Sequence, residues 1–579
     1  MINIGGLIFA MSAFAYLMAV ITGIFSYKKQ TLSKWVNIFS LASAVLITFD
    51  MILLVYYQVI HDFHYAYVYG HTSTDLAPAY LVSALWAGQE GSFLLWAVIN
   101  SWMGFVFLRG LDKHGFKNIS AFIGLSVINM SIMVMAILSR PFKTMNYLQV
   151  EGLGLNTALQ DPWMVVHPPL VFIGYSSMAV LFSIGLCVGP EIEDSCEKLM
   201  LRKWALMGWF FLGLGIFTGS IWAYRALGWG GYWAWDPIEN AALIPWLLLA
   251  GICHEGRSAS KPGSRVKYML PFVTAAFGTF LARSGILKDK SVHAYTVSSL
   301  SIPLFVFLAV LVVMIILYFS LSKAKKKGAD RRSTGISIFS ILNVNLYAFA
   351  ILIFLGTIFP LISGIAVPMA FFNYSALLFS MVFVALFIAQ YYVRFKEDCF
   401  GILFTSAITT AAICLIMKFT SLTWLLVLWV FLIPLVLWMV NILRTKPKLH
   451  IKMIKGSSAA MAHTGAILLI LGVITSTAFS EQGTILVTDG SFTDLGYGVM
   501  LDGADLDKES STIIHTIGAD IILSPADSGL SLSAVKAVNY TTRPLIWLFW
   551  IGGGLIILGN LGAHMNQKKC YLGCKKKQH

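Results

Sequence analysis

The sequence has few charged residues. Only 12% of its 579 residues are Asp, Glu, Lys or Arg, whereas soluble domains carry about 25%. Hydrophobic residues make up 58%, which excludes both an ordinary cytosolic globular protein and a disordered chain. The composition is that of a polytopic membrane protein.

Cysteine and negative charge are also scarce. The seven cysteines lack the spacing of a zinc site with further ligands, so we interpret them as structural or incidental. The 41 Lys and Arg against 27 Asp and Glu give a net charge of +14. The positive-inside rule explains this excess better than nucleic-acid binding does. No cleavable signal is evident, and we interpret the first apolar run as a span.

A membrane-spanning helix needs about 20 apolar residues. Such runs occur fifteen times, near residues 3–26, 36–60, 91–108, 120–139, 168–189, 204–223, 240–255, 268–286, 301–320, 342–363, 374–393, 400–418, 423–443, 459–479 and 544–562. Basic residues gather after the first, third, seventh, ninth and thirteenth runs, which makes every second loop cytoplasmic. We therefore expect an all-α polytopic membrane protein of about 15 transmembrane helices. Its N-terminus lies outside and its basic C-terminal tail lies in the cytoplasm.

One outer segment is large and acidic. Residues 480–543 contain nine acidic and three basic residues, and short β-rich stretches alternate there with Gly, Asp and Ser turns. We expect a small β-rich extracytoplasmic domain before the last span. The predicted organisation is a helical bundle over 1–479, this domain over 480–543, and the last span with its tail over 544–579.

A tryptophan-rich outer loop covers residues 224–246. Glycines are interleaved with its aromatic rings, which include Trp229, Trp233, Trp235 and Trp246. One interpretation is an aromatic belt at the membrane interface. The other is a shelf for a planar apolar ligand, because glycine lets a flat ligand approach the backbone and rigid rings offer stacking area.

The end of this loop has the pattern of a helix start. Asp236 at the N-cap, Pro237 at the first position and Glu239 at the third form a capping box that opens the seventh span. We expect these residues to fix the exit angle of the loop rather than to contact a ligand.

Four of the twelve histidines sort into pairs by depth. His167, which precedes two prolines and which we expect at a rigid helix entrance, shares the outer side with His293. His254 and His463 lie at matched depth near the inner ends of two spans. A histidine inside a span is costly and often functional. Each pair could be axial metal ligands, carbonyl-bonded histidines or a proton relay.

Two arginines lie near the outer ends of spans. Arg225 and Arg283 could snorkel to the interface or clamp a ligand carboxylate with the guanidinium fork. The second interpretation suits haem, which carries two propionates.

The run from Trp229 to Trp246 resembles the WWD signature of haem-handling membrane proteins in cytochrome c maturation. Within that superfamily it is similar to the CcmF type, the cytochrome c haem lyase of the System I pathway. The stretch Trp86-Ala-Gly-Gln-Glu-Gly-Ser92 followed by Trp96, the triplet at His167, and Arg283-Ser-Gly also match.

The resemblance implies a set of roles. His167 and His293 would be catalytic outer ligands of haem, and His254 and His463 would ligate a resident haem b. Arg225 and Arg283 would contact propionates. The haem shelf would comprise Trp229, Gly230, Gly231, Trp233, Trp235, Asp236 and Trp246.

The resemblance also implies the reaction, the partners and the location. Such a protein lies in the bacterial inner membrane and receives haem from the periplasmic chaperone CcmE. It works with the thiol component CcmH and promotes thioether bonds to Cys-x-x-Cys-His of apocytochrome c. The resident haem reduces the incoming haem, with quinol as a candidate electron donor. The alternatives are a paralogue dedicated to one multihaem cytochrome, a haem exporter, and a respiratory subunit that only relays electrons.

Overall fold

The computed structural model describes most of the chain and divides it into two compact units. The first comprises Met1–Trp222, Trp233–Phe372 and Cys570–His579, and the second comprises Ala223–Tyr232 and Asn373–Lys569. The described residues are 4–27, 34–113, 119–147, 149–187, 195–226, 231–255, 265–287, 291, 300–323, 337–395, 404–411, 422–444, 458–488, 492–495, 497, 499–502, 512–525 and 535–575.

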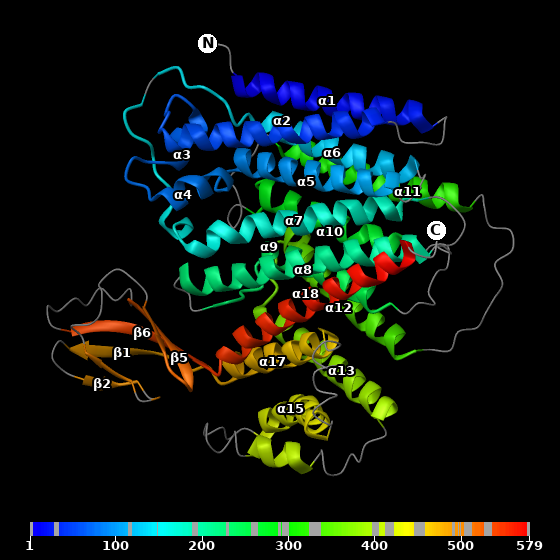
Figure 1. Ribbon diagram of the computed structural model, residues 1–579. Helices are drawn as coiled ribbons and strands as arrows, with labels where there is room; N and C mark the ends of the chain where they lie inside the picture. The colour runs from blue at the N-terminus through cyan, green and yellow to red at the C-terminus, as the bar shows by residue number, and fades with distance from the viewer. Residues whose placement is uncertain are drawn as a thin grey trace. The chain divides into compact units, whose positions relative to one another are not determined.

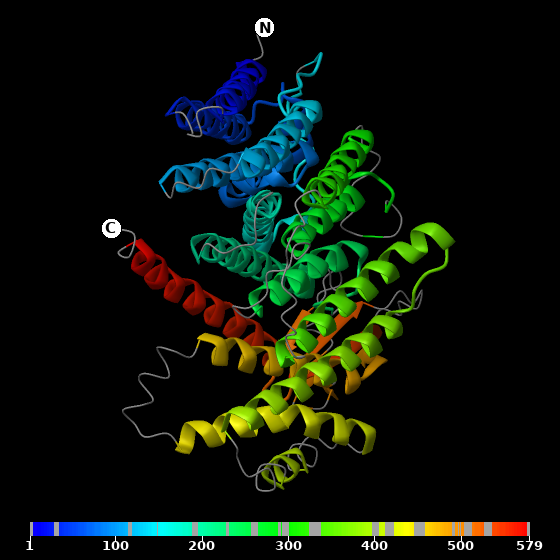
Figure 2. The same cartoon turned by 90° about the vertical axis from the view of Figure 1, so that its right-hand side faces the viewer.

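The first unit is helical. Within it α1 packs along α2 and α5 along α6, pairs that both views show (Figure 1 and Figure 2). Its elements, of which α8 ends in the second unit, are α1 (Ile4–Tyr27), α2 (Lys34–Val59), α3 (Ala66–His71), α4 (Pro78–Ser83), η1 (Ala84–Trp86), α5 (Gln89–Lys113), α6 (Ile119–Ser139), η2 (Thr157–Leu159), α7 (Pro162–Gly185), α8 (Ser195–Ala226), α9 (Pro237–Cys253), α10 (Val266–Arg283), α11 (Ser301–Lys323) and α12 (Ile338–Ser363).

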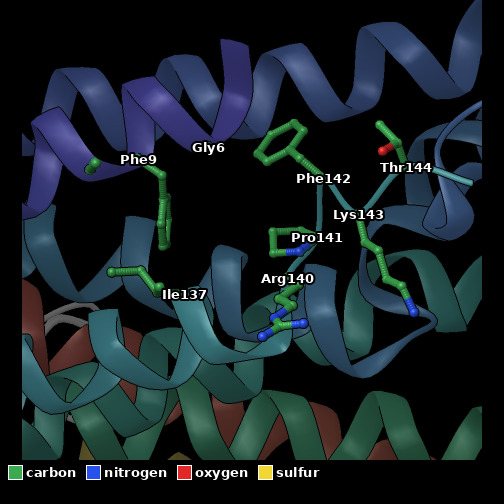
Figure 3. Close-up of a pocket in the computed structure, with 9 residues that line it drawn as sticks. Gly6, Phe9, Ile137, Arg140, Pro141, Phe142, Lys143 and Thr144 are labelled. Carbon is green, nitrogen blue, oxygen red and sulfur yellow. The ribbon is translucent and has the colours of Figure 1, made fainter. Parts of the chain in front are cut away.

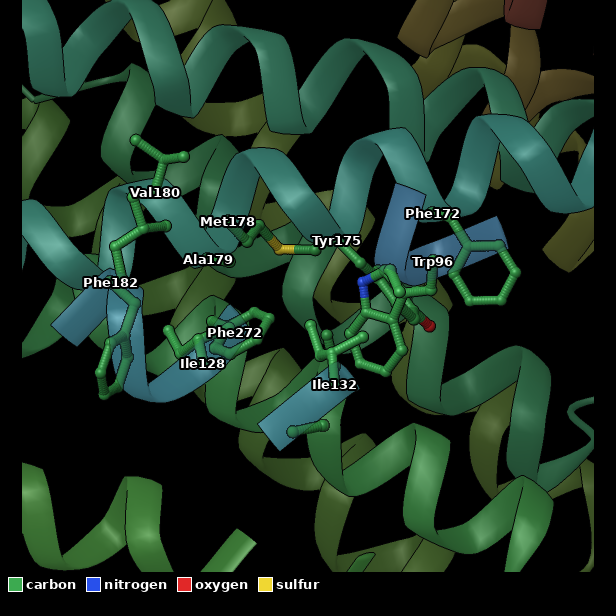
Figure 4. Packing of buried hydrophobic residues seen from close by; sticks show 14 of the residues in the cluster. Trp96, Ile128, Ile132, Phe172, Tyr175, Met178, Ala179, Val180, Phe182 and Phe272 are labelled. Carbon is green, nitrogen blue, oxygen red and sulfur yellow. The ribbon is translucent and has the colours of Figure 1, made fainter. Parts of the chain in front are cut away.

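Buried aromatic rings fill the core of this first unit. Trp96 of α5 stacks on Phe172 of α7 with ring centroids 5.8 Å apart, and Phe182 of α7 meets Phe272 of α10 edge to face at 5.9 Å. Figure 4 shows these side chains with Met178 and Ile132 between them. The continuous apolar runs of the sequence make this all-round burial possible.

The second unit combines helices with a small sheet. Its helices are mainly α13 (Met369–Phe395), α15 (Leu422–Arg444), α17 (Ser458–Ala478) and α18 (Trp547–Lys575). The sheet order is β1-β6-β5-β4, all antiparallel, and β2 pairs with β3 separately. The strands are β1 (Gln482–Thr488), β2 (Phe492–Asp494), β3 (Met500–Asp502), β4 (Thr512–His515), β5 (Ala519–Pro525) and β6 (Val535–Pro544).

Glycines bring α17 and α18 into close contact. A Cβ on Gly552 of α18 would lie 2.6 Å from the carbonyl oxygen of Gly465 of α17, and a Cβ on Gly472 would lie 2.3 Å from the backbone nitrogen of Phe549. Small residues at such positions let two membrane helices approach until their backbones touch. His463 lies two residues before this crossing.

The predicted fold class is confirmed. Eleven helices of the described part of the chain are long and apolar enough to cross a membrane, and two shorter apolar helices cover 237–253 and 426–437. Helices coincide with the fifteen apolar runs, including helical residues 404–411 within the run at 400–418. The β-rich segment before the last helix is also present, since β1 and β5 both lie within residues 480–543.

Candidate functional site

The tryptophan-rich loop ends in the predicted capping box. The Asp236 side chain accepts a hydrogen bond from the Ile238 backbone N–H at 2.8 Å, and Glu239 accepts one from the Asp236 N–H at 3.0 Å. Glu239 also accepts from the Ala234 N–H at 2.9 Å. The two carboxylates thus satisfy backbone donors that the start of α9 would otherwise expose, and the prediction is confirmed.

Trp235 has an unusual backbone conformation beside this cap. Its φ is +55°, a left-handed conformation that bulky residues rarely adopt. Its ring stacks on Phe372 with centroids 5.3 Å apart and meets Trp233 edge to face at 5.8 Å. Asn240 donates to the Trp235 carbonyl at 3.1 Å. Strain held by such contacts is typical of functional loops.

Trp246, predicted at the end of the loop 224–246, instead lies inside α9, because the capping box at Asp236 ends the loop ten residues earlier. Its ring stacks on Trp209 of α8 with centroids 5.0 Å apart and planes 11° apart, and its indole N–H donates to the Trp209 carbonyl at 3.1 Å. Trp246 therefore fastens α9 to α8. Of the other predicted shelf residues, Gly231 could carry a Cβ that would meet no atom of the described residues within 4 Å, whereas Trp229 and Gly230 lie outside the described residues.

The start of the loop is anchored within the second unit. The buried Tyr232 hydroxyl lies 2.9 Å from the Ser476 hydroxyl, and its ring packs on Phe549 at 4.4 Å. Burial raises the pKa of Tyr232, so the phenol stays protonated. Tyr224 donates to Asp520 of β5 at 2.8 Å. The sequence analysis missed both anchors.

His167 lies inside a helix, which corrects the predicted position at a helix entrance. Helix α7 begins five residues earlier at Pro162, where the Asp161 side chain accepts from the Trp163 N–H at 2.8 Å. Pro168 cannot donate to the Met164 carbonyl. The indole of Trp86 donates to that carbonyl instead, at 3.1 Å, so the helix continues through the proline.

The ring of His167 lies against glycines of α8. Its Nδ1 is 2.7 Å from the Gly215 carbonyl oxygen, and a Cβ on Gly219 would come within 2.8 Å of the ring. A carbonyl accepts only from a protonated Nδ1, so the Nε2 carries the lone pair that a metal needs. Trp222 stacks near the ring at 6.3 Å. His293, the predicted outer partner, lies outside the described residues.

The two predicted inner histidines have different surroundings. His254 caps the C-terminus of α9, and its Nδ1 lies 2.8 Å from the Ala250 carbonyl oxygen, which again leaves the lone pair on Nε2. His463 of α17 lies among aromatic rings, 5.7 Å from Phe387 and 6.4 Å from Phe383 by centroids. They belong to different units, and their pairing stays a prediction.

The two candidate arginines differ in exposure. Arg283, in the last turn of α10, is buried, and its guanidinium lies 5.0 Å from the centroid of the Phe93 ring. This position is unlike a side chain that snorkels to water. Arg225, in the last turn of α8, is exposed.

The Trp86–Ser92 motif is held by hydrogen bonds and a close backbone contact at the start of α5. The Ser92 hydroxyl donates to the Gly88 carbonyl at 2.6 Å, and the Tyr67 hydroxyl donates to the Leu85 carbonyl at 2.7 Å. A Cβ on Gly91 would meet the Leu85 carbonyl oxygen at 1.7 Å. The motif thus holds the start of α5 and positions Trp86 against α7.

A cleft of about 370 Å³ lies elsewhere in the first unit. Figure 3 shows Phe9 of α1 on one wall and the turn with Arg140, Phe142 and Lys143 on the other. It contains none of the predicted site residues.

The part of the chain that contains these features is similar to known proteins. Residues 86–287, which include the Trp86 motif, His167 and the tryptophan-rich loop, match the family described as "Cytochrome C assembly protein". A CcmF protein of Pseudomonas aeruginosa is 31% identical over 88% of this chain and 87% of its own length. A probable NrfE protein of Escherichia coli is 31% identical over 62% of this chain and 67% of its own length.

A solved structure titled "Cytochrome c Heme Lyase CcmF" has a TM-score of 0.73, with 19% identity over 96% of this chain and 97% of that one. The fold and the matched region define a multi-pass membrane protein of the cytochrome c assembly class. Within that class, the chain belongs to the CcmF family of cytochrome c-type biogenesis proteins.

Proposed function

We propose that this protein is a cytochrome c haem lyase that presents haem above the tryptophan-rich loop and promotes its thioether attachment to Cys-x-x-Cys-His of apocytochrome c. The observation that carries the proposal is the ring of His167, whose Nδ1 lies 2.7 Å from the Gly215 carbonyl oxygen, a hydrogen bond that orients the imidazole. Positioning alone can supply much of the rate, because it turns a multi-body encounter into a local one.

The outer haem is the substrate, and this chain supplies its binding site. His167 and His293 are its ligands. Trp233 and Trp235, whose rings meet edge to face, contribute aromatic surfaces, and the capping box of α9 fixes the adjacent end of the loop. Trp229, Gly230, Gly231, Asp236 and Trp246 complete the shelf region. Arg225 and Arg283 bind the propionates through the guanidinium fork.

The resident cofactor is haem b, held by His254 and His463. Both side chains fit this role in the described structure. The His254 Nδ1 hydrogen bond fixes the tautomer that a ligand needs, and the rings around His463 give an apolar setting for a macrocycle. When bound, this haem supplies electrons for the incoming haem, with quinol as a candidate donor.

The proposed partners and location rest on the resemblance to this family. CcmE delivers haem, CcmH handles the client thiols, and the protein lies in the bacterial inner membrane with its N-terminus outside and C-terminus inside. Residues 480–543 face the periplasm between the bundle of 1–479 and the segment 544–579. The match to an NrfE protein favours one second candidate, a paralogue that serves a single multihaem cytochrome.

The test is a pyridine haemochrome assay on the detergent-purified protein, with reduced-minus-oxidised spectra. The wild type should carry a non-covalent b-type haem that His254→Ala and His463→Ala lose. His167→Ala should keep that haem and stop cytochrome c maturation. His64→Ala, outside both pairs, is the control that should retain both.

A full haem complement in both inner variants would contradict the resident-haem assignment. Normal maturation in the His167 variant would contradict the outer site. Maturation of one multihaem cytochrome alone, measured across several clients, would favour the dedicated paralogue.

A further inference from the structure

Asp50 carries a carboxyl group that is buried inside a helix long and apolar enough to span a membrane. It lies in α2 between Ile47 and Leu54, on the stripe that faces the interior of the first unit, and all three side chains are 0% exposed. Helix α2 lies between α1 and α5, which both pack along it (Figure 1). Ionisable residues are rare inside membrane spans, and those that occur are usually functional.

The Asp50 carboxyl makes no hydrogen bond to any residue that the structure describes, since neither Oδ1 nor Oδ2 has a partner. Other buried polar groups of the same helices are used to join them. The Ser12 hydroxyl of α1 donates to the Ser43 carbonyl of α2 at 3.0 Å, and the Asn129 amide of α6 donates to the Tyr16 hydroxyl of α1 at 2.7 Å. Asp50 therefore differs from these residues in having no structural contact of this kind.

Packing alone does not explain an aspartate at this position. A buried polar group that makes no hydrogen bond destabilises a fold, and a leucine between Ile47 and Leu54 would avoid that cost. The ionised carboxylate is the costlier form in an apolar setting unless a cation pairs with it. These surroundings suit the neutral acid, which carries a proton that it must have gained from water.

The side chains that could pair with Asp50 lie elsewhere. In α2 and the elements that pack most against it, the other titratable side chains that the structure describes are Lys34, Tyr56, Tyr57, Tyr16, Tyr80, Glu90 and Arg109. Lys34 is the first residue of α2, and Glu90 and Arg109 lie near the two ends of α5. None of them is hydrogen-bonded to Asp50. A proton is therefore the ligand that neutralises this carboxylate.

Two further polar side chains lie toward the nearer end of α2, at Val59. Gln58 is on the same buried stripe and is 0% exposed, and neither its Oε1 nor its Nε2 has a partner among the described residues. His61 follows the helix, and its Nε2 is also buried without a partner in that part of the chain. An amide and an imidazole can each donate and accept hydrogen bonds, so both can take part in moving a proton.

We propose that Asp50 is a proton-binding site inside the membrane, filled and emptied from the Val59 end of α2 past Gln58 and His61. The ligand is the hydronium ion. The carboxylate takes its proton to give the neutral acid and a water molecule, and the reverse step returns the proton without any change in oxidation state. The proposed orientation of the chain places the Val59 end on the periplasmic side.

The experiment is infrared spectroscopy of the full-length protein in lipid nanodiscs, transferred from H₂O to D₂O. The wild type should show the carbonyl band of a neutral carboxylic acid, and the band should shift as deuterium replaces the proton. Asp50→Asn should lose this band, while its circular dichroism stays that of the wild type and shows that it folds. Glu151→Gln is the control, because it removes an exposed carboxylate that already accepts hydrogen bonds from Thr74, and it should keep the band.

Variants on either side of Asp50 test the route. Gln58→Leu should keep the band and slow its shift in D₂O severalfold, whereas Ser43→Ala, toward the other end of the stripe, should exchange at the wild-type rate. Wild-type exchange in Gln58→Leu, or slowed exchange in Ser43→Ala, would overturn the route from the Val59 end. Identical spectra of the wild type and Asp50→Asn, or a band that does not shift in D₂O, would overturn the proton site itself. These measurements involve neither haem nor a cytochrome, so their outcome is independent of the proposed lyase function.

Discussion

The proposed ligand role of His167 depends on two residues that carry no side chain. Gly215 supplies the carbonyl that orients the ring, and Gly219 supplies the space in which the ring lies. We predict that Gly219→Ala displaces the imidazole, because the added Cβ would come 2.8 Å from Nδ1 and Cε1. Overpacking of this kind costs about 1–3 kcal/mol. Cytochrome c maturation per mole of protein should fall while the resident haem remains.

Gly110→Ala of α5 is the matched control, since a Cβ there meets no atom of the described part of the chain within 4 Å. It should leave maturation and thermal stability unchanged or slightly improved. Equal maturation by the two alanine variants would show that the space at Gly219 of α8 does not set the position of His167.

At the same scale, the sequence predicts contacts that are local. The cap at Asp236 and Glu239 could be predicted because both partners lie within one helical turn. The bonds of Tyr224 to Asp520 and of Tyr232 to Ser476 join residues 296 and 244 positions apart. No periodic pattern in one sequence reports such pairs, so both tyrosines were missed.

For the helices, the apolar runs predict which helices exist better than they predict the residue at which each helix begins. The prolines after His167 suggested a helix start, yet α7 begins at Pro162 because Asp161 caps it. Pro168 cannot donate to the Met164 carbonyl, which accepts a hydrogen bond from the indole of Trp86, 78 residues earlier in the chain. A long-range donor thus overrides the local preference of the residue before proline.

The crossing of α17 and α18 allows a prediction for these two helices. In Gly552→Ala the new Cβ would lie 2.3 Å from the Leu469 backbone nitrogen, so the helices must separate. We expect a loss of about 1–3 kcal/mol and a lower content of resident haem, because His463 lies beside the crossing. Thermal melting of the detergent-solubilised protein and haem spectra measure both effects.

Gly554→Ala, two residues along the same helix, is the control, because among the residues that the structure describes its Cβ would meet no atom within 4 Å. A melting temperature for Gly552→Ala equal to that of Gly554→Ala would show that the close approach of the two helices does not stabilise the protein.

At the scale of the whole molecule, the distribution of charged residues predicts the orientation of the chain in the membrane. The chain carries +14, yet residues 480–543 carry nine acidic and three basic residues, while basic residues gather in alternate loops. Positive loops stay in the cytoplasm, so we expect the β-domain outside and the C-terminal tail inside. Alkaline phosphatase, which is active only outside the cytoplasm, should be active when inserted between β1 and β2.

A fluorescent protein that matures only in the cytoplasm should fluoresce when fused after His579, and the same fusion before Met1 should stay dark. Because the β-domain and the tail are joined by a single membrane-spanning helix, α18, they must lie in opposite compartments, so both reporters should be active. Activity of only one of these two reporters would mean that α18 does not cross the membrane. Inactivity of both, with fluorescence of the fusion before Met1, would mean that the orientation is inverted, and the proposed haem shelf would then face the cytoplasm, where a periplasmic chaperone could not deliver haem.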